Sequence, residues 1–343
     1  MILRLIFDVL HPAHVHFFRP LAQEVLKDGG EVLFTAREKD VTLDLLRSYG
    51  LPYEVLTGIG GGMVGLAREL VIRCARLTWR VKRFRPDLLL GIMGPVIAPV
   101  SRVTRVPSWV FYDTETAALT NRFVYPICHR LYLPGSYRGT APERAIRYPG
   151  YHELAYLHPS RFTADPAVRE EAGLGSKEPF AVVRLVSWEA SHDLGDSGFS
   201  DPVAFVTWLS SQIRVVISGE RGVPEPLQHL ALKLAPERMH HLLAAADLYV
   251  GEGATMAAEA AVLGTPAIFV HSARLGYMLD LEEEFSLLWN MNGEQQARPA
   301  IEACLRDLEV TRKSFERRRE AMLAERIDVG QFLIREVHGA LKS

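Results

Sequence analysis

Short apolar runs alternate along the chain with longer segments whose apolar residues recur at helical spacing. The runs have the length of buried strands, and glycine, proline or charged residues end them. They cover residues 2–7, 31–36, 86–91, 107–112, 180–186, 213–218 and 248–250. Helical spacing extends over residues 17–28, 63–84, 203–212, 236–246, 256–263, 312–324 and 329–341.

This alternation predicts parallel sheets covered by helices on both faces. The strand-and-helix plan of the first half is repeated in the second half. We therefore expect an α/β protein with two Rossmann-like domains facing each other across a cleft. In this fold class ligands bind at the carboxyl ends of the strands.

Charge and composition support two domains in one chain. Of the 343 residues, 48% are hydrophobic and 23% are charged, as in soluble globular proteins. Residues 1–150 carry 20 Lys and Arg against 13 Asp and Glu, and residues 151–343 carry 19 against 28, which gives +7 and −9. This asymmetry supports a domain boundary near Gly150, with domains at 1–150 and 151–325.

The cellular location follows from what the sequence lacks. Three cysteines, Cys74, Cys128 and Cys304, are too few and too far apart for a disulfide framework. No apolar stretch reaches 18 residues, and the N-terminal run is too short for a signal peptide. We expect a cytoplasmic protein with no nucleic-acid partner.

The most informative stretch is D-L-Y-V-G-E-G-A-T-M-A-A-E-A-A-V-L-G-T-P-A-I-F-V, residues 247–270. It predicts a strand, a loop with Gly251 and Gly253, a helix with Thr255 as N-cap and Gly264 as stop, and a second strand. The helix begins at the carboxyl end of a strand, so its unpaired N–H groups and positive dipole end suit a phosphate.

Glu259 lies in the first helical turn, four residues after Thr255. This is not the spacing of a capping box, so we expect its carboxylate to accept hydrogen bonds from a ligand hydroxyl. The alternative is an acidic residue favoured by the helix dipole and otherwise solvated.

These residues resemble the nucleotide-sugar site of GT-B glycosyltransferases, among them the lipid-linked GlcNAc transferase of peptidoglycan synthesis, and of UDP-GlcNAc 2-epimerases. The motifs D-x-x-x-P-x-H-V-H-F-F (8–18), R-L-V-S-W-E-A-S-H-D (184–193) and G-E-G-A-T-M-A-A-E-A (251–260) are most similar to an uncharacterised prokaryotic family of unknown function in this superfamily. The resemblance implies a GT-B fold with an acceptor-side N-terminal domain, a donor-binding second domain and a last helix (326–343) that crosses back.

The resemblance also implies the donor site. The glycine loop and the helix start would hold the diphosphate, and Glu259 the ribose hydroxyls. Arg184 ends a strand facing this loop and either clamps the diphosphate or forms an ion pair across the strand ends. The expected binding set is Arg184, Ser187, Ser218, Gly219, Gly251, Gly253, Ala254, Thr255 and Glu259.

Three histidines, His11, His14 and His16, crowd the loop that we expect at residues 8–16. The H-x-H pair allows a metal site, but no carboxylate or cysteine has matching spacing. Packing in the core is a second possible role of these rings, and a general base for a sugar hydroxyl is a third. By resemblance to GT-B transferases, His14 or His16 is the base and Asp113 its orienting carboxylate.

Glu115 supports the rival activity, since an acidic residue in this place of the 2-epimerases helps to move a proton next to the anomeric carbon. The sequence departs from the epimerases in M-G-P-V (93–96) and lacks their H-R-x-E-N pattern after Val186. We therefore expect a metal-independent glycosyltransferase that uses a UDP-sugar and needs no cofactor. A 2-epimerase-like isomerase and a non-catalytic nucleotide-sugar-binding protein are the alternatives.

The segment from Met63 to Arg85 follows a glycine-rich loop and combines an apolar face with seven Lys and Arg against one Glu. An ordinary amphipathic helix on the sheet would have this pattern. A helix that rests on anionic lipid would also have it, and would suit a lipid-linked acceptor and a position at the inner face of the membrane.

Overall fold

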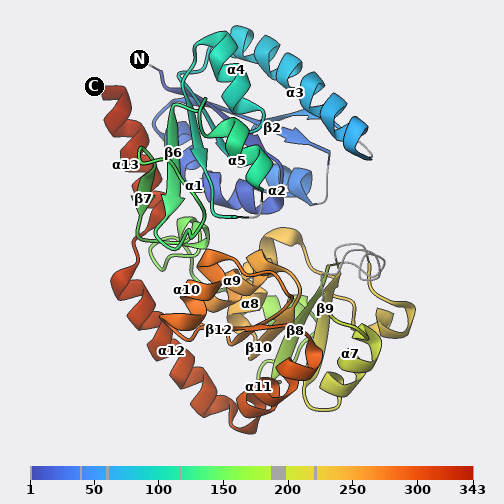
Figure 1. The fold of residues 1–343 in the computed structure, drawn as a ribbon. Helices are drawn as coiled ribbons and strands as arrows, with labels where there is room; N and C mark the ends of the chain where they lie inside the picture. Colours follow the sequence, from blue (N-terminus) through green and yellow to red (C-terminus); the bar gives the residue numbers. More distant parts are fainter. Residues whose placement is uncertain are drawn as a thin grey trace. The chain divides into compact units, whose positions relative to one another are not determined.

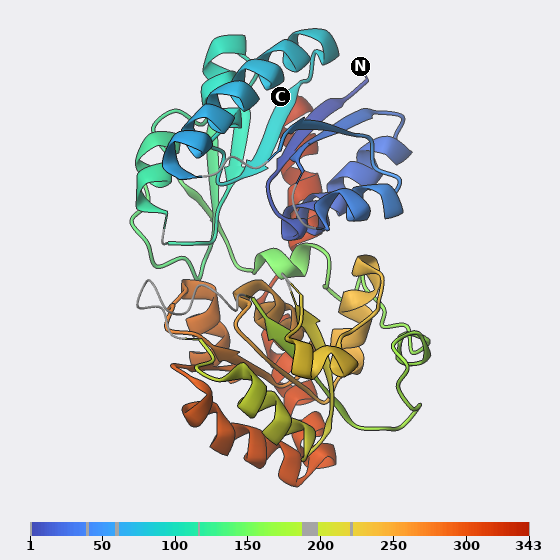
Figure 2. The same ribbon diagram turned by 90° about the vertical axis from the view of Figure 1, so that its right-hand side faces the viewer.

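The computed structural model describes residues 2–38, 41–58, 62–115, 117–186, 198–219 and 222–342. The chain divides into two compact units, residues 1–158 with 327–343, and residues 159–326 (Figures 1 and 2). The first boundary therefore follows His158, not Gly150 as the charge asymmetry suggests. The linking residues beyond Gly150 belong to the first unit because η1 (His152–Ala155) packs against its helices.

The first unit is built on a parallel sheet in the order β3-β2-β1-β4-β5-β6-β7. Its strands are β1 (Arg4–Val9), β2 (Glu31–Arg37), β3 (Tyr53–Thr57), β4 (Leu88–Ile92), β5 (Ser108–Phe111), β6 (Arg130–Pro134) and β7 (Ile146–Tyr148). Both faces are apolar, as expected for a parallel sheet buried on both sides.

Helices cover both faces of this sheet. They are α1 (Pro12–Lys27), α2 (Thr42–Ser48), α3 (Gly62–Phe84), α4 (Ile97–Thr104), α5 (Ala118–Val124) and α13 (Val329–Lys342). Alternate strand residues point to opposite faces: Ile6 packs with α3, α4 and α5, and Phe7 contacts Phe18 of α1.

The last helix returns to the first unit, as the GT-B resemblance implies. Phe332 of α13 packs against Tyr132 of β6 and Tyr148 of β7, with ring centroids 5.9 and 5.2 Å apart. The Tyr132 hydroxyl donates to Glu336 at 2.8 Å. Figure 1 shows α13 beside β6 and β7, so strands from the first half and the chain's end share one core.

The second unit has a parallel sheet in the order β12-β11-β10-β8-β9. Its strands are β8 (Phe180–Leu185), β9 (Arg214–Gly219), β10 (Leu248–Gly251), β11 (Ala267–Val270) and β12 (Leu288–Met291). Its helices are α6 (Val168–Glu171), α7 (Pro202–Ser210), η2 (Glu225–Leu230), η3 (Pro236–Arg238), α8 (Met239–Ala245), α9 (Ala254–Leu263), α10 (Gly276–Glu283), α11 (Glu294–Arg306) and α12 (Leu308–Glu325).

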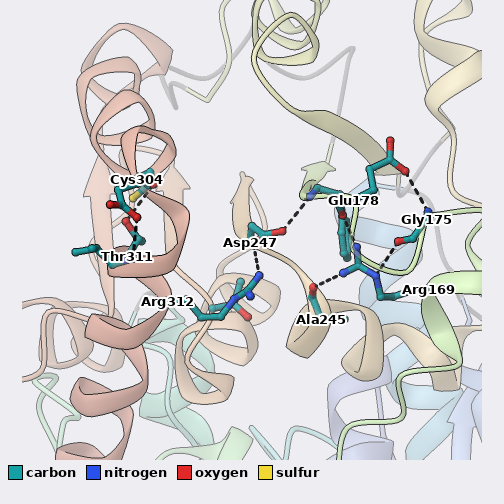
Figure 3. A network of polar contacts seen from close by, with 12 residues as sticks. Arg169, Gly175, Glu178, Ala245, Asp247, Cys304, Thr311 and Arg312 are labelled. Atoms are coloured by element: carbon teal, nitrogen blue, oxygen red, sulfur yellow. Dashed lines mark hydrogen bonds and ion pairs between the residues drawn. The ribbon is translucent and has the colours of Figure 1, made fainter.

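Polar contacts fix the amino-terminal edge of the second sheet (Figure 3). Asp247, just before β10, accepts the backbone N–H of Phe180 at 3.0 Å and pairs with Arg312 of α12. Arg169 donates to the carbonyl oxygens of Gly175 and Ala245, both at 3.1 Å. These charged and polar groups thus hold the amino-terminal edge of the sheet together.

Candidate functional site

The glycine loop of the second unit connects β10 to α9. β10 ends at Gly251, and α9 begins at Ala254 with Gly253 as its N-cap residue. The prediction that Thr255 is the N-cap residue is wrong. Gly253 is the last residue with an extended backbone before the helix (φ −86°, ψ 106°), and Thr255 lies inside the helix. Gly264 ends α9 in the left-handed conformation (φ 86°), as predicted.

Three neighbouring strands place predicted binding residues side by side at the carboxyl edge of the sheet. Arg184 of β8 is in register with Ser218 of β9 and with Gly251 of β10, and Gly219 follows at the next level. The Arg184 guanidinium donates to the Ser218 Oγ at 2.8 Å. A cation, a hydroxyl and a bare glycine backbone therefore meet beside the start of α9.

Glycine is required at this edge because other chain segments approach the backbone closely. A Cβ at Gly251 would lie 2.7 Å from the Cβ and 2.8 Å from the carbonyl oxygen of Arg184. A Cβ at Gly219 would lie 2.1 Å from the carbonyl oxygen of Gly222. All three distances are too short for a real Cβ atom, so Gly251 allows Arg184 to lie against the loop and Gly219 allows the backbone of Gly222 to approach.

Glu252, between the two loop glycines, is a further polar residue of this edge that the sequence did not single out. Its carboxylate accepts the backbone N–H groups of Val186 at 3.1 Å and Phe199 at 3.0 Å. Burial raises its pKa. The loop sequence gave no signal for this, since its partners lie more than 50 residues away. The predicted ligand residue Ser187 lies outside the described residues.

Glu259 lies in the second turn of α9, not in the first as predicted, because the helix begins at Ala254, two residues earlier than expected. Its side chain is buried, which excludes the alternative of a solvated carboxylate. Its Oε1 lies 3.0 Å from the Nε2 of His240 on α8, and both side chains are 7% exposed. The pairing arises because α9 packs on α8 and turns this face inward. A carboxylate has several lone-pair positions, so this pairing is compatible with an additional ligand contact.

In the first unit, the prediction of a loop over residues 8–16, which contains the three histidines, is wrong. β1 extends to Val9, and α1 begins at Pro12 with His11 as N-cap residue. The His11 Nδ1 accepts the backbone N–H of Ala13 at 3.2 Å, and a proline in the first helical position needs no N–H partner. His14 and His16 therefore belong to a helix and are buried.

His16 packs inside the first unit. Its ring stacks on Tyr156 with centroids 5.2 Å apart, and its Nδ1 lies 3.3 Å from the Tyr49 hydroxyl. These contacts give His16 the environment of a core histidine, which is one of the roles that the sequence pattern allows.

His14 lies near Asp113, but it is not the histidine that Asp113 contacts directly. The Asp113 Oδ2 lies 3.0 Å from the Nδ1 of His152 on η1. Burial alone would raise the pKa of Asp113, but the electrostatic effect of His152 and the hydrogen bonds from His152 and Thr114 outweigh it and lower the pKa. His152 had no sequence signal, because the tertiary fold brings it to Asp113 from beyond β7.

Burial lowers the pKa of His14 well below its usual value, and His11 lowers it further. Asp113 opposes these effects, while His152 and Arg37 also lower the pKa. The carboxyl edge of the first sheet therefore holds a neutral histidine beside an Asp–His pair.

Glu115, the residue that favoured an epimerase, has a backbone partner. Its Oε1 accepts the N–H of Arg138, between β6 and β7, at 3.0 Å. Among the described residues, no group of three or more His, Cys, Asp or Glu is placed to hold a metal ion.

Three arginines of α3 have partners inside the first unit. Arg73 is 2% exposed and lies 2.7 Å from the Asp8 Oδ1, which also accepts from Thr35 at 2.8 Å. Arg80 pairs with Glu54 at 2.8 Å, and Arg76 donates to the carbonyl of Leu56. We expected Arg73, Arg76, Arg80 and Arg83 to contact lipid, and the first three of these side chains instead serve the fold.

The outer side of α3 is nevertheless apolar and basic. Val71 and Trp79 are 68% and 53% exposed, and the guanidinium of Arg83 lies 4.7 Å from the Trp79 ring centre. Across the described part of the chain, none of the helices has the length and hydropathy needed to span a bilayer.

A protein-family model described as "Protein of unknown function (DUF354)" matches residues 3–281. A UDP-N-acetylglucosamine--N-acetylmuramyl-(pentapeptide) pyrophosphoryl-undecaprenol N-acetylglucosamine transferase of Actinobacillus pleuropneumoniae serotype 5b is 26% identical over 283 residues, 77% of each chain.

Solved structures match over nearly the whole chain. The UDP-GlcNAc 2-epimerase from Neisseria meningitidis bound to UDP-GlcNAc has a TM-score of 0.70, 12% identity and coverage of 99% of this chain and 100% of its own. The glycosyltransferase SnogD from Streptomyces nogalater has a TM-score of 0.61, 15% identity and coverage of 99% and 100%. The fold of two Rossmann-like domains is thus the one that the resemblance implies.

Proposed function

This chain belongs to the DUF354 family, and we propose that it is a glycosyltransferase that takes its sugar from a UDP-sugar. The observation that carries the proposal is the carboxyl edge of the second sheet, where Arg184, Ser218 and Gly251 are in register beside the first turn of α9. Its relatives and structural neighbours are glycosyltransferases and UDP-GlcNAc 2-epimerases, which supports a UDP-sugar at this edge.

The chemistry of this edge suits a diphosphate. The first N–H groups of α9 have no partners within the helix, and the helix dipole adds a positive potential there. Arg184 supplies a cation with a planar fork of donors that can bind two phosphate oxygens. The loop glycines have no side chains and therefore let Arg184 pack against the start of α9.

Glu259 would bind the ribose hydroxyls while His240 holds its carboxylate from the other side. Because two hydroxyl groups can donate to one carboxylate, this contact would select a ribose over a deoxyribose. Leaving-group stabilisation in this site would come from Arg184 and the helix dipole, with no metal required.

The runner-up is a 2-epimerase-like isomerase, and the match to the epimerase over 99% of this chain favours it. Glu115 was the acidic residue expected to serve that reaction. Glu115 accepts the Arg138 backbone N–H, and the chain lacks the H-R-x-E-N pattern of the epimerases after Val186, so we rank the isomerase second. A non-catalytic UDP-sugar-binding protein is the third candidate.

Ligand-induced thermal shift tests donor binding. UDP and UDP-N-acetylglucosamine should raise the melting temperature of the wild type, since a ligand that binds the native state stabilises it. Arg184→Ala should abolish the shift. Arg214→Ala is the matched control, because Arg214 is an exposed arginine at the opposite end of the neighbouring strand. If neither UDP nor UDP-N-acetylglucosamine shifts the melting temperature of the wild type, the proposal of a UDP-sugar donor site is contradicted.

Heavy water separates the two enzyme classes. An epimerase exchanges the proton on the second sugar carbon, so mass spectrometry of recovered UDP-N-acetylglucosamine would show added deuterium. A transferase releases UDP, slowly to water if no acceptor is present, and leaves that position unlabelled. Deuterium in the recovered donor would replace the transferase proposal with the isomerase.

We further propose that the outer side of α3 rests on anionic lipid and brings the enzyme to a lipid-linked acceptor. The related Actinobacillus transferase, whose name specifies a pyrophosphoryl-undecaprenol acceptor, supports this substrate class. Exposed Val71 and Trp79 would enter the interfacial region while Arg68, Lys82 and Arg83 meet the headgroups. Each engaged cation contributes about 1 kcal/mol at low salt.

Vesicle sedimentation tests this surface. The wild type should sediment with phosphatidylglycerol vesicles at low salt and be released at high salt. Changing Arg68, Lys82 and Arg83 to Glu should abolish sedimentation. The matched control changes Arg306, Lys313 and Arg317, exposed cations of α11 and α12, to Glu. A wild type that stays in the supernatant at low salt would contradict membrane contact and favour a soluble acceptor.

A further inference from the structure

Two buried histidines of the first unit face Asp113 from different elements. His14 comes from the first turn of α1, and His152 comes from η1, after the last strand of the sheet. The resemblance to GT-B transferases favours His14 or His16 as the base that takes a proton from the acceptor. The hydrogen bonds of His14 and His152 distinguish their possible roles.

His14 uses the lone pair of Nδ1 for a structural bond. The backbone N–H of Leu10 donates to this nitrogen at 3.2 Å. An amide N–H can only donate, so the neutral His14 ring must carry its own hydrogen on Nε2. Burial keeps the ring neutral by lowering its pKa. In this tautomer His14 offers a hydrogen-bond donor and has no accessible lone pair for a proton.

His152 has the opposite tautomer. Asp113 is ionised, since its pKa is lowered, and an ionised carboxylate can only accept. The His152 Nδ1, 3.0 Å from the Asp113 Oδ2, therefore carries the hydrogen. The neutral ring then has its lone pair on Nε2, which is the arrangement of a histidine held by a carboxylate as a general base.

The Nε2 of His152 is buried and has no hydrogen-bond partner among the described residues. An unsatisfied buried polar atom is destabilising, so such an atom in a native fold calls for an explanation. Phe17 packs on the ring with centroids 4.4 Å apart and restricts its rotation. A hydroxyl that reaches this nitrogen would supply the missing bond.

We infer that His152, oriented by Asp113, is the general base that accepts the proton of the acceptor hydroxyl. The inference rests on the proposed transferase function. In the step, the acceptor oxygen bonds to the anomeric carbon of the sugar and its proton passes to His152 Nε2. The bond from that carbon to the diphosphate oxygen breaks, and UDP leaves with the electron pair.

Histidine NMR tests the tautomers without any ligand. Selective ¹⁵N labelling and spectra that correlate ring nitrogens with ring protons distinguish Nδ1–H from Nε2–H, and single His→Gln variants assign the signals. At pH 8, His152 should be the Nδ1–H tautomer and His14 the Nε2–H tautomer. A His152 ring with its hydrogen on Nε2, or on both nitrogens, would overturn the inference.

Asp113→Asn gives a signature that a purely structural role would not produce. The asparagine amide can donate to Nδ1 and would move the His152 hydrogen to Nε2, so the tautomer should reverse while the fold persists. This variant also keeps the inference testable if His152→Gln does not fold.

The rate of UDP release from UDP-N-acetylglucosamine, with water as acceptor, measures how each variant affects catalysis. Asp113→Asn and His152→Gln should each lower kcat by about 100-fold or more, the usual size of general-base effects, with unchanged affinity for UDP. His14→Gln should lose much less. A loss with His14→Gln that equals or exceeds that with His152→Gln would make His14 the base instead.

Calorimetric titration with UDP distinguishes a failure of the proposed transferase function from a failure of the role assigned to His152. A wild type that binds no UDP contradicts the proposed function, and the NMR result then still decides the tautomers. A wild type that binds and releases UDP, with full activity in Asp113→Asn and His152→Gln, contradicts only the role of His152.

Discussion

At the scale of single residues, several charged side chains of the predicted sites have partners inside the protein. Glu259 pairs with His240, Asp113 with His152, and Arg73 with Asp8. Buried charged groups need such partners, because an unpaired charge in the interior costs several kcal/mol. Substitution of these residues is therefore expected to lower the stability of the protein as well as its function.

Glu259→Ala should lower the melting temperature as well as UDP affinity. The change leaves the His240 Nε2 without its buried partner, which costs about 1–3 kcal/mol. Glu259→Gln keeps an acceptor oxygen and should lose less stability, and Glu302→Ala on the exposed side of α11 is the control. An unchanged melting temperature for Glu259→Ala would show that the pair is not part of the stable fold.

His14 should make the stability of the protein depend on pH. Its folded pKa lies well below the ordinary 6.5, so below about pH 6.5 the unfolded chain binds more protons than the folded one. Stability must then fall as the pH decreases through this window. Burial of His129 and His241 lowers their pKa values also and acts in the same direction.

The measurement is the free energy of unfolding between about pH 7.5 and about pH 5.5, the range in which histidines titrate. The wild type should lose stability over this range, and His14→Gln should show a smaller slope. Equal slopes in the two proteins would mean that His14 titrates at its ordinary pKa.

At the scale of elements, α3 shows how a single helix divides its arginines between two tasks. Arg73 points to the carboxyl edge of β1, where Asp8 and Glu69 surround it. Arg83 lies on the outer side, over Trp79. The helix repeat of 3.6 residues per turn places successive arginines on different faces, so some meet the sheet and others meet solvent.

Arg73→Ala should therefore destabilise the protein far more than Arg83→Ala. Removing Arg73 leaves Asp8 buried without its cation, and breaking a buried pair costs about 3–5 kcal/mol. An exposed position such as Arg83 should change stability by no more than about 0.5 kcal/mol. Urea unfolding midpoints compare the two, and similar midpoints would contradict the internal role of Arg73.

At the scale of the whole molecule, the chain completes its first unit only at its end. Leu333 and Val337 of α13 are fully buried, and Phe332 contacts β6 and β7. The first unit therefore combines residues 1–158 with 327–343, and the second unit forms from the residues between them.

Leu333→Ala should weaken the first unit although Leu333 follows the second unit in the chain. A buried Leu→Ala change costs about 2–5 kcal/mol. Amide hydrogen exchange should accelerate in β1, β4 and β6 but stay slow in β8 and β10. Arg335→Ala, at an exposed position of the same helix, is the control. Faster exchange confined to the second unit would contradict this division of the chain.

Local sequence pattern was sufficient for the fold class and for most of the elements near the glycine loop. The apolar runs at 31–36 and 180–186 became β2 and β8 within a residue, and the helix expected at 329–341 became α13. These patterns are local, because burial of a strand or a helix face leaves a period in the sequence itself. Shorter and less regular elements, such as α2, α5, β6 and β7, carry too few residues to show a period.

Tertiary packing determined which histidine meets Asp113, which partner Glu259 has, and which arginines of α3 point inward. The resemblance suggested His14 or His16 for Asp113, yet His152 arrives from beyond β7, and His240 reaches Glu259 from the preceding helix. Such pairs form between residues far apart in the chain and depend on how the elements pack. No local pattern encodes this packing, so contacts at the site follow from the fold.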